Sequence, residues 1–295
     1  MAENTVKKIA TRESYGNSLK ELAEEFPNLV VLDADLAAAT KTGIFRKAYP
    51  DRHIDCGIAE SNMMGVAAGL SLVGKIPFVS SFAMFAAGRA FEQVRNSIGY
   101  PHLNVKIGAT HAGITVGEDG ATHQCNEDIA LMRTIPGMVV MCPSDDVEAR
   151  AAVRAALEYE GPVYIRFGRA AVPVINDHPG YHFEIGKGTV VREGKDVTIV
   201  ATGICVDSAL GAAKMLEEEG ISAEVVNICT IKPLDEEIII NSAKKTGKVV
   251  TVEEHSVIGG LGSAVCDCLC ANHPVPVKKV GMQDVFGESG SAAAL

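Results

Sequence analysis

The feature that most constrains the fold of this chain is the alternation of strand-like and helix-like segments along most of its length. Short β-branched runs at residues 28–35 (NLVVLDAD), 76–82 (IPFVSSF) and 104–110 (NVKIGAT) are separated from one another and from later strands by helix-like segments such as 58–74 and 146–160. Strands that alternate with helices are typical of a parallel sheet with helices on both faces. The sequence therefore predicts an α/β fold built on parallel or mixed sheets.

The alternation is interrupted once, at residues 172–188 (VPVINDHPGYHFEIGKG). This segment is rich in proline, glycine and aspartate, a composition typical of a loop or linker. Strand-like and helix-like segments then resume and continue nearly to the end of the chain. We therefore predict two α/β domains, residues 1–175 and 188–295, joined by a linker at 176–187.

Composition and charge argue against several classes of partner. The formal net charge is −10 and no stripe of lysine and arginine is present, so we expect no binding to nucleic acid. The most apolar helix-like run, residues 58–73, is interrupted by polar residues and is too polar to span a membrane. Eight cysteines without an apolar signal core at the N-terminus indicate free thiols in a reducing compartment. We predict a cytoplasmic protein without a membrane partner.

Two groups of potential metal ligands are poor matches to a metal site. Residues 266–270 form a C-x-C-x-C pattern, but on a helix these cysteines point to different faces. His111, His123 and Cys125 could be combined as zinc ligands, yet their spacing does not suit a structural zinc site. We predict buried structural thiols and no metal held by this chain.

The segment most suited to chemistry is residues 110–124 (THAGITVGEDGATHQ), which directly follows a predicted strand. It combines two histidines and an acid pair with several glycines and has no hydrophobic period, so it is a loop. The aspartates of residues 33–36 and the end of the strand at 76–82 also lie at carboxyl ends of predicted strands. Ligands of open parallel sheets bind at this edge. We therefore expect the functional site there.

Single residues near this edge leave two interpretations open. Glu60 lies in the first turn of a predicted helix, where a carboxylate either serves a ligand or only interacts favourably with the helix dipole. Phe82 and Phe85 could form a stacking platform for a flat ring or belong to the core. Arg89 and Arg95, in the next helix-like segment, are expected to be solvated helix charges.

In combination, these segments resemble the second half of transketolase, which consists of the pyrimidine-binding domain and the C-terminal domain of a thiamine diphosphate enzyme. The resemblance extends over nearly the whole chain, is highly specific in GEDGATHQ, and is only general after about residue 185. The segments that carry it are ATR (10–12), DADL (33–36), GIAE (57–60), SFAMF (81–85), THAGITVGEDGATHQ (110–124) and GPVYIRFGR (161–169).

The resemblance implies roles for four residues at the cofactor. Glu60 matches the catalytic glutamate that hydrogen-bonds N1′ of the aminopyrimidine and promotes its imino tautomer. Phe82 and Phe85 match the aromatic residues that stack on the pyrimidine ring. Asp35 matches an acid close to the cofactor and to the subunit contact.

The resemblance also implies a substrate site. His123 matches a catalytic histidine near the reacting carbonyl, and Asp119 matches the acid that binds the substrate C2 hydroxyl. His111 and Arg169 match residues that hold the phosphate of a sugar phosphate, with Arg12 as a third cation for that group. A guanidinium group suits phosphate because it can donate two parallel hydrogen bonds.

Two positions depart from the pattern of the family. Ala39 occupies the place of a serine that helps to bind phosphate, for which Thr40 or Thr42 could substitute. Gly88 occupies the place of an aromatic residue of the pyrimidine pocket. These departures concern the sugar phosphate and the shape of the pocket, and they leave the catalytic glutamate in place.

The chain lacks the GDG motif through which enzymes of this kind bind Mg²⁺ and the diphosphate. The resemblance therefore implies the C-terminal subunit of a split transketolase, acting with an N-terminal subunit that holds Mg²⁺ and the diphosphate in an A2B2 heterotetramer. Such an enzyme of the pentose phosphate pathway transfers a two-carbon ketol unit from a ketose phosphate to an aldose.

Two other functions remain open from the sequence. The first is a β subunit of a 2-oxo acid dehydrogenase or an enzyme similar to deoxyxylulose-phosphate synthase. Residues 161–169 and 250–263 resemble the second half of the latter enzyme. The second is a regulatory subunit of the same fold without catalysis. The intact Glu60, Asp119 and histidines argue against the second.

Overall fold

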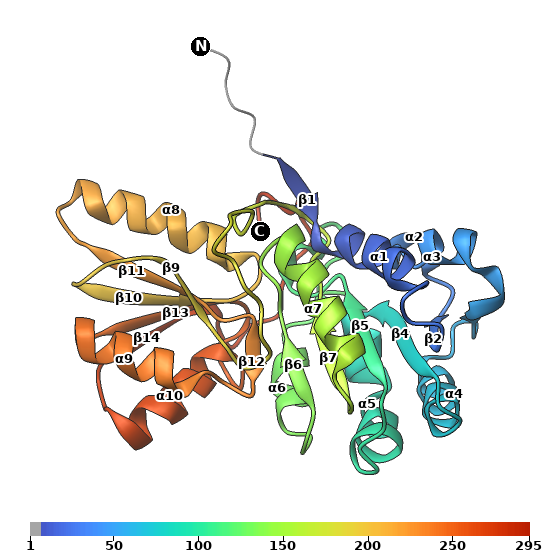
Figure 1. Ribbon diagram of the computed structural model, residues 1–295. Helices are drawn as coiled ribbons and strands as arrows, with labels where there is room; N and C mark the ends of the chain where they lie inside the picture. Colours follow the sequence, from blue (N-terminus) through green and yellow to red (C-terminus); the bar gives the residue numbers. More distant parts are fainter. Residues whose placement is uncertain (1–6) are drawn as a thin grey trace.

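The computed structural model of this protein describes residues 7–295 and contains two open sheets, each with helices on both faces. Figure 1 shows the first sheet, with α1 and α7, beside the second sheet, with α8, α9 and α10. The predicted α/β class with parallel and mixed sheets is confirmed. Among the described residues, no helix is both long enough and apolar enough to cross a membrane.

The larger sheet has seven strands, and all pairs of neighbours but one are parallel. The exception is β12, which comes from the second half of the chain and pairs antiparallel with β6. The order is β12 (Thr230–Lys232), β6 (Val139–Met141), β7 (Val163–Arg166), β5 (Lys106–Thr110), β4 (Ile76–Phe82), β2 (Leu29–Asp33) and β3 (His53–Asp55).

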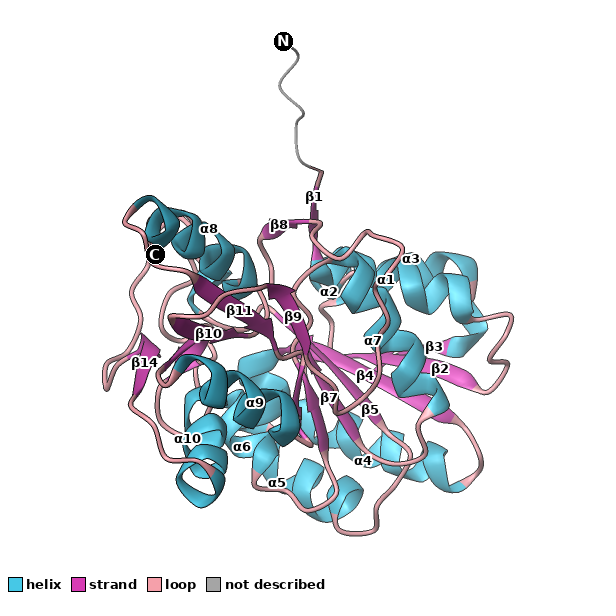
Figure 2. Ribbon diagram, turned by 60° about the vertical axis from the view of Figure 1, so that its left-hand side comes forward, coloured by secondary structure: helices cyan, strands magenta, loops and turns pink. Residues whose placement is uncertain are grey.

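The helices of the first half lie on both faces of this sheet, as Figure 2 shows for α1 and α7 on one side and α4 and α5 on the other. Two of the segments, η2 and η3, are π-helical, and two are 3₁₀ turns. The elements are α1 (Thr11–Leu22), α2 (Ala37–Thr40), α3 (Gly43–Ala48), η1 (Pro50–Arg52), α4 (Glu60–Leu72), η2 (Met84–Arg89), α5 (Phe91–Gln93), η3 (Val94–Gly99), η4 (Ile114–Val116), α6 (Asp128–Arg133) and α7 (Asp146–Glu158).

The alternation of side chains along each strand explains why both faces need helices. In β2, Leu29 and Val31 pack into the core shared with α1 and α7, whereas Val30 and Leu32 pack into the core on the α4 side. All four side chains are buried. A strand that is apolar on both faces is typical of a central parallel sheet and explains the unbroken β-branched run at 28–35.

The second sheet has five strands, parallel except for β9 at one edge. Its order is β14 (Val277–Met282), β13 (Val249–Ser256), β10 (Val197–Ala201), β11 (Ala223–Asn227) and β9 (Thr189–Arg192). Helix α8 covers one face, and α9 and α10 cover the other (Figure 1). The three helices are α8 (Cys205–Glu218), α9 (Glu236–Thr246) and α10 (Leu261–Asn272). A small ribbon joins β1 (Lys8–Ala10) to β8 (Ala171–Pro173).

The two halves share a continuous interior. One apolar cluster contains Ile107 of the first sheet together with Val200 and Leu261 of the second half. Buried polar contacts reinforce the junction, because the Glu148 carboxylate accepts hydrogen bonds from Asn227 Nδ2 at 2.9 Å and from the Tyr181 hydroxyl at 3.1 Å. Burial raises the pKa of Glu148. The second half is therefore packed against the first half over the edge where β6 meets β12.

Candidate active site

The parallel order of β2, β4 and β5 brings three segments to one edge of the first sheet. Strand β2 ends at Asp33, β4 at Phe82 and β5 at Thr110. The segments that follow these strands contain the aspartates, the phenylalanines and the histidine-rich loop, so the expected convergence at the carboxyl edge is present.

Glu60 is the first residue of α4 and its side chain is only 2% exposed. Its carboxylate accepts hydrogen bonds from Arg89 Nη1, at 2.9 Å to Oε2 and 3.1 Å to Oε1. Arg89 is exposed, as predicted for a solvated helix charge, but it also forms an ion pair with Glu60 that the prediction did not include. Arg89 ends the π-helical segment η2, whose wider turn differs from the α-helical spacing assumed for the solvated face. Arg95 is exposed, and among the described residues its side chain hydrogen-bonds only to Asn96.

Phe82 and Phe85 form a stacked pair, with ring centroids 6.0 Å apart and an angle of 12° between the ring planes. The His111 ring stacks on Phe82 at 3.8 Å, and the edge of the His123 ring faces Phe85 at 5.3 Å. Phe82 at the end of β4 and Phe85 just after it thus meet two histidines of the loop at 110–124 in one aromatic cluster. The structure brings these four predicted site residues together.

His111 is buried and has a positive φ of 57°, which is rare for a residue with a side chain and is concentrated at functional sites. Burial and the nearby charges of Arg12 and Arg169 lower its pKa to about 3, so the ring is neutral. Arg12 Nη1 lies 3.1 Å from His111 Nε2 and can only donate. The ring proton is therefore on Nδ1, which donates to Thr110 Oγ1 at 2.9 Å.

Arg12 and Arg169 both lie close enough to this histidine for their charges to lower its pKa. Burial and the charge of Arg169 lower the pKa of Arg12. Arg12 Nη1 also donates to the carbonyl of Ala39 at 2.8 Å, whereas its buried Nε has no partner in the structure. An unpartnered buried N–H of a guanidinium beside a second guanidinium is a suitable donor for an anionic group.

Arg169 is not free in this structure. Its Nη1 donates to the Glu118 carboxylate at 2.9 Å and to the carbonyl of Val116. Glu118 is exposed. A hydrogen bond from its own backbone N–H, together with the hydrogen bond and the positive charge of Arg169, lowers the pKa of its carboxylate. The glutamate next to the predicted Asp119 therefore forms an ion pair with a predicted phosphate ligand, a contact that the sequence reasoning did not foresee.

Two predicted residues do not join the cluster through side-chain contacts. Asp119 is exposed and its side chain has no hydrogen bond or ion pair among residues 7–295. Asp35 is also exposed, with a φ of 62°, and its backbone N–H donates to Asp55 Oδ1 at 3.1 Å. Both side chains are therefore exposed and are not held in place by a side-chain contact with the described residues.

The two departures from the family pattern have local explanations. The hydroxyl groups of Thr40 and Thr42 both donate to the buried Asp33 carboxylate at 2.8 Å. They are therefore not free to take the place of the serine that Ala39 replaces. At Gly88 a Cβ atom would lie 2.2 Å from the Met84 terminal methyl group. Met84 thus fills space next to Gly88, which leaves no room there for an aromatic ring.

The second half of the chain contributes a residue that sequence reasoning missed. Glu254, at the end of β13, accepts a hydrogen bond from the backbone N–H of Thr115 at 2.6 Å. Its side chain lies so close to Gly113 that a Cβ there would be 2.2 Å from the Glu254 carboxyl carbon. Burial raises the pKa of Glu254. The adjacent acids in VTVEEHS are the signal that could have suggested this role.

Further contacts hold the same loop from both sides. Arg166 is buried, forms an ion pair with Asp128 at 2.9 Å and donates to the carbonyls of Cys125 and Glu254. Gln124 Nε2 donates to the carbonyl of Glu288 in the C-terminal tail at 2.9 Å. Arg166 is thus a structural link between the halves, and its guanidinium group is engaged by groups of the protein itself.

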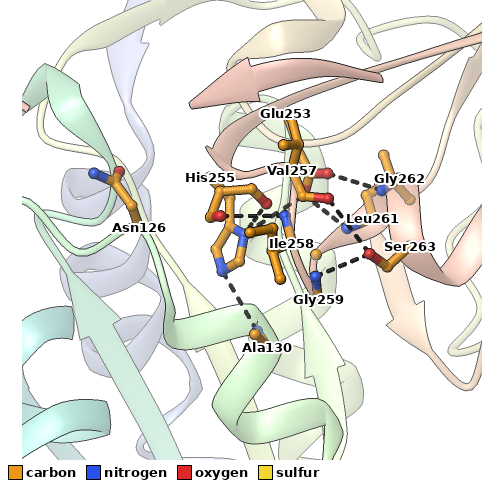
Figure 3. A network of polar contacts seen from close by, with 12 residues as sticks. Asn126, Ala130, Glu253, His255, Val257, Ile258, Gly259, Leu261, Gly262 and Ser263 are labelled. Atoms are coloured by element: carbon orange, nitrogen blue, oxygen red, sulfur yellow. Dashed lines mark hydrogen bonds and ion pairs between the residues drawn. The ribbon is translucent and has the colours of Figure 1, made fainter. Parts of the chain in front are cut away.

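A polar network beyond Glu254 connects β13 to α6 and α10 (Figure 3). The Glu253 carboxylate accepts hydrogen bonds from the N–H groups of Leu261 and Gly262 at the start of α10. His255 Nε2 accepts from the N–H of Ala130 at 3.4 Å, and Gly259 lies at the turn before the helix. The glycines at 259–262 thus lie at the entry to α10.

A cavity of about 450 Å³ opens next to the aromatic cluster. It is lined by Met84, Phe85, Arg89, Ala121, Thr122 and Phe286. A buried carboxylate, a pair of stacked aromatic rings and an adjacent cavity fit the aminopyrimidine of thiamine diphosphate, which is flat and offers ring nitrogens to a carboxylate. Among residues 7–295, no three His, Cys, Asp or Glu side chains are grouped so that they could hold a metal ion.

Comparisons with known proteins show the family to which the chain belongs. The family model of the transketolase pyrimidine-binding domain matches residues 7–174, and that of the transketolase C-terminal domain matches residues 186–295. The chain is 53% identical over 286 residues to a protein of Methanocaldococcus jannaschii described as a transketolase C-terminal section, covering 96% of this chain and 90% of that protein.

Two further matches bear on the assembly and the substrate. The chain is 50% identical to a 6-deoxy-6-sulfo-D-fructose transketolase subunit of a Clostridium species, covering 95% of this chain and 86% of the relative. A solved structure described as a split gene transketolase in an inactive beta4 tetramer matches with a TM-score of 0.88 and 60% identity, covering 95% of this chain and 91% of that one.

The fold, the site and these matches together define the pyrimidine-binding half of a thiamine diphosphate enzyme. The chain belongs to the transketolase family, of which it contains the pyrimidine-binding domain and the C-terminal domain.

Proposed function

We propose that the chain is the C-terminal subunit of a split transketolase, which transfers a two-carbon ketol unit from a ketose phosphate to an aldose. The observation that carries this proposal is the buried Glu60 carboxylate beside the Phe82–Phe85 pair and a cavity. The chain has no GDG motif, so an N-terminal subunit would hold Mg²⁺ and the diphosphate. We propose an A2B2 heterotetramer, because the cofactor would be held between two kinds of subunit.

On the cofactor side, the residues of this chain would hold and activate the ring. When bound, thiamine diphosphate supplies a carbon nucleophile for the carbonyl group of a ketose. Glu60 would share a proton with N1′ of the aminopyrimidine, and Phe85 and Phe82 would hold the ring by stacking. Asp35, exposed on the rim, would lie near the cofactor at the contact with a neighbouring subunit.

On the substrate side, His123 would exchange a proton with the carbonyl oxygen, because its ring lies in the aromatic cluster, edge to face with Phe85. Asp119 would bind the C2 hydroxyl of the sugar from the exposed loop. Arg12 and Arg169 would bind the terminal anion, with the neutral His111 holding the Arg12 guanidinium in place through Nε2. In this assignment His111 orients a cation, since both of its ring nitrogens are already engaged.

The identity of that terminal anion follows from the same chemistry. Phosphate and sulfonate groups both present several oxygens to a guanidinium group. One relative is described as a subunit for 6-deoxy-6-sulfo-D-fructose, so a sulfonated sugar is an alternative donor for this chain. The buried, unpartnered Nε of Arg12 would donate to either group.

The test is reconstitution with an N-terminal subunit that carries a GDG motif. We expect ketol transfer from xylulose 5-phosphate only when this chain, the N-terminal subunit, thiamine diphosphate and Mg²⁺ are all present. Rapid transfer by this chain alone would contradict the split enzyme. A complex that consumes pyruvate but no ketose would instead assign the chain to an enzyme similar to deoxyxylulose-phosphate synthase or to a 2-oxo acid dehydrogenase.

A further inference from the structure

One side chain contacts both Phe85 and Glu60, the two residues proposed to hold the ring of the cofactor. The Arg89 guanidinium lies over the Phe85 ring, 4.6 Å from its centroid. The same guanidinium donates to both oxygens of the Glu60 carboxylate through Nη1. Its side chain is 51% exposed and also lines the adjacent cavity.

These two contacts are the ones that an aminopyrimidine would make in the proposed function. A guanidinium group is planar, stacks on aromatic faces and donates N–H groups to a carboxylate. It therefore satisfies the same aromatic face and the same buried acceptor as the ring would. Phe85 and Glu60 cannot serve both groups at the same time, since the guanidinium already lies on the face of Phe85 and bonds both oxygens of Glu60.

We propose that Arg89 is an internal competitor of the cofactor: it occupies the pyrimidine site of the free subunit and must leave Glu60 and Phe85 when the ring binds. This inference rests on the proposed function. Leaving costs little in solvation, because half of the Arg89 side chain already faces water. In the free subunit the arrangement keeps a buried carboxylate paired, which avoids the cost of an unpaired charge.

The position of Arg89 supports a movable side chain. It is the last residue of the π-helical segment η2, and π-helical turns are frequent at functional sites. Its neighbours in the cavity include Met84 and Phe286, of which Phe286 is 83% exposed. An extended arginine therefore has open space on the cavity side into which it can turn.

The experiment measures ring binding by the full chain, without any partner. The probe is the free alcohol of the aminopyrimidine half of thiamine, which is uncharged and needs neither Mg²⁺ nor the diphosphate site. Its dissociation constant is measured by calorimetry for the wild type, Arg89→Met, Arg89→Lys and the control Arg95→Met. Arg95 is exposed and its side chain hydrogen-bonds only to Asn96 among the described residues, so its loss controls for the removal of one positive charge from this region.

We expect Arg89→Met to bind the probe more tightly than the wild type. If the ion pair holds the site for about nine-tenths of the time, the apparent dissociation constant falls about tenfold. Arg95→Met should bind like the wild type. Arg89→Lys should lie in between, because an ammonium group pairs with Glu60 but cannot stack flat on Phe85.

Salt provides a second readout that does not involve activity. The partly exposed ion pair is screened by salt, so probe binding by the wild type should tighten as NaCl is raised. Binding by Arg89→Met should not change in this way. An equal or weaker affinity of Arg89→Met, or an equal response of both proteins to salt, overturns the inference.

The outcome also separates this inference from the proposed function. A reconstituted wild-type complex that binds thiamine diphosphate and transfers ketol units, together with no gain of probe affinity in Arg89→Met, refutes the competitor alone. If no variant binds the probe and the complexes with the N-terminal subunit fail to bind thiamine diphosphate, both the competitor and the proposed function are refuted.

Discussion

Glu254 of the second half accepts a hydrogen bond from the backbone N–H of Thr115, 2.6 Å away, in the histidine-rich loop of the first half. The carboxylate also packs directly on Gly113, where any side chain would collide with it. The loop that carries the proposed substrate residues Asp119 and His123 is thus held by a residue of the C-terminal domain. This domain therefore contributes to the form of the site.

The contact predicts a loss of substrate affinity on removal of the carboxylate. In the reconstituted complex, Glu254→Ala should raise KM for the ketose phosphate by about tenfold, because a hydrogen bond to a charged group contributes roughly 1.5–3 kcal/mol. Glu254→Gln, which keeps an acceptor oxygen, should raise it less. Glu218→Ala, an exposed glutamate of α8, is the matched control. If KM is unchanged in Glu254→Ala, the loop does not depend on this anchor.

The ion pair between Glu118 and Arg169 predicts that removal of the Glu118 charge increases the affinity for a phosphorylated donor. Glu118→Gln should lower KM for the phosphorylated donor by a factor of about two to five, the range of an exposed ion pair, because Arg169 is then free to bind the anion. Arg169→Met should have the opposite effect. Steady-state kinetics with phosphorylated and unphosphorylated donors would check this, since the gain should vanish for a donor without an anionic group.

Several parts of the fold could be predicted from sequence because they depend on local pattern. The strand-like run at 76–82 matches β4, and the helix-like run at 146–160 contains α7. The convergence of Phe82 with the loop at 110–124 follows from parallel strand order alone. These features can be predicted from the hydrophobic period of each segment and from the rule that ligands bind at the carboxyl ends of parallel strands.

Other features could not be predicted because they depend on long-range contacts. The pairing of Arg89 with Glu60 spans 29 residues. It also depends on a π-helical turn, which no pattern of residues in this segment predicts. The addition of β12 to the first sheet and the contact of Glu254 with Thr115 depend on how the halves dock. The way in which the two halves dock depends on the combined fit of many side chains from both. Local patterns in single segments of the sequence do not predict this fit.

Glu253 predicts a pH dependence of stability. Burial raises its pKa from the ordinary value of 4.5 to about 7. The unfolded chain therefore loses this proton at lower pH than the folded chain, so this group's stabilisation is complete below pH 4.5 and is lost as pH rises to about 7. The full shift corresponds to roughly 3 kcal/mol as an upper bound.

A comparison with Glu253→Gln isolates this effect. The variant resembles the protonated carboxyl group, so the wild type should lose free energy of unfolding relative to the variant between pH 5 and pH 8. Neighbouring His255, whose pKa is lowered by burial, changes with pH in both proteins and largely cancels in the difference. Urea unfolding at the two pH values is the measurement, and a difference independent of pH would contradict the raised pKa.

The central claim is that Glu60 activates the aminopyrimidine ring. Its most direct measurement is the ketol-transfer rate of Glu60→Gln in the reconstituted complex at saturating thiamine diphosphate, with Glu24→Gln, an exposed glutamate, as control. Loss of a charge-assisted hydrogen bond of about 1.5–3 kcal/mol predicts a fall in rate of at least about tenfold. A Glu60→Gln complex that keeps the wild-type rate would contradict the account.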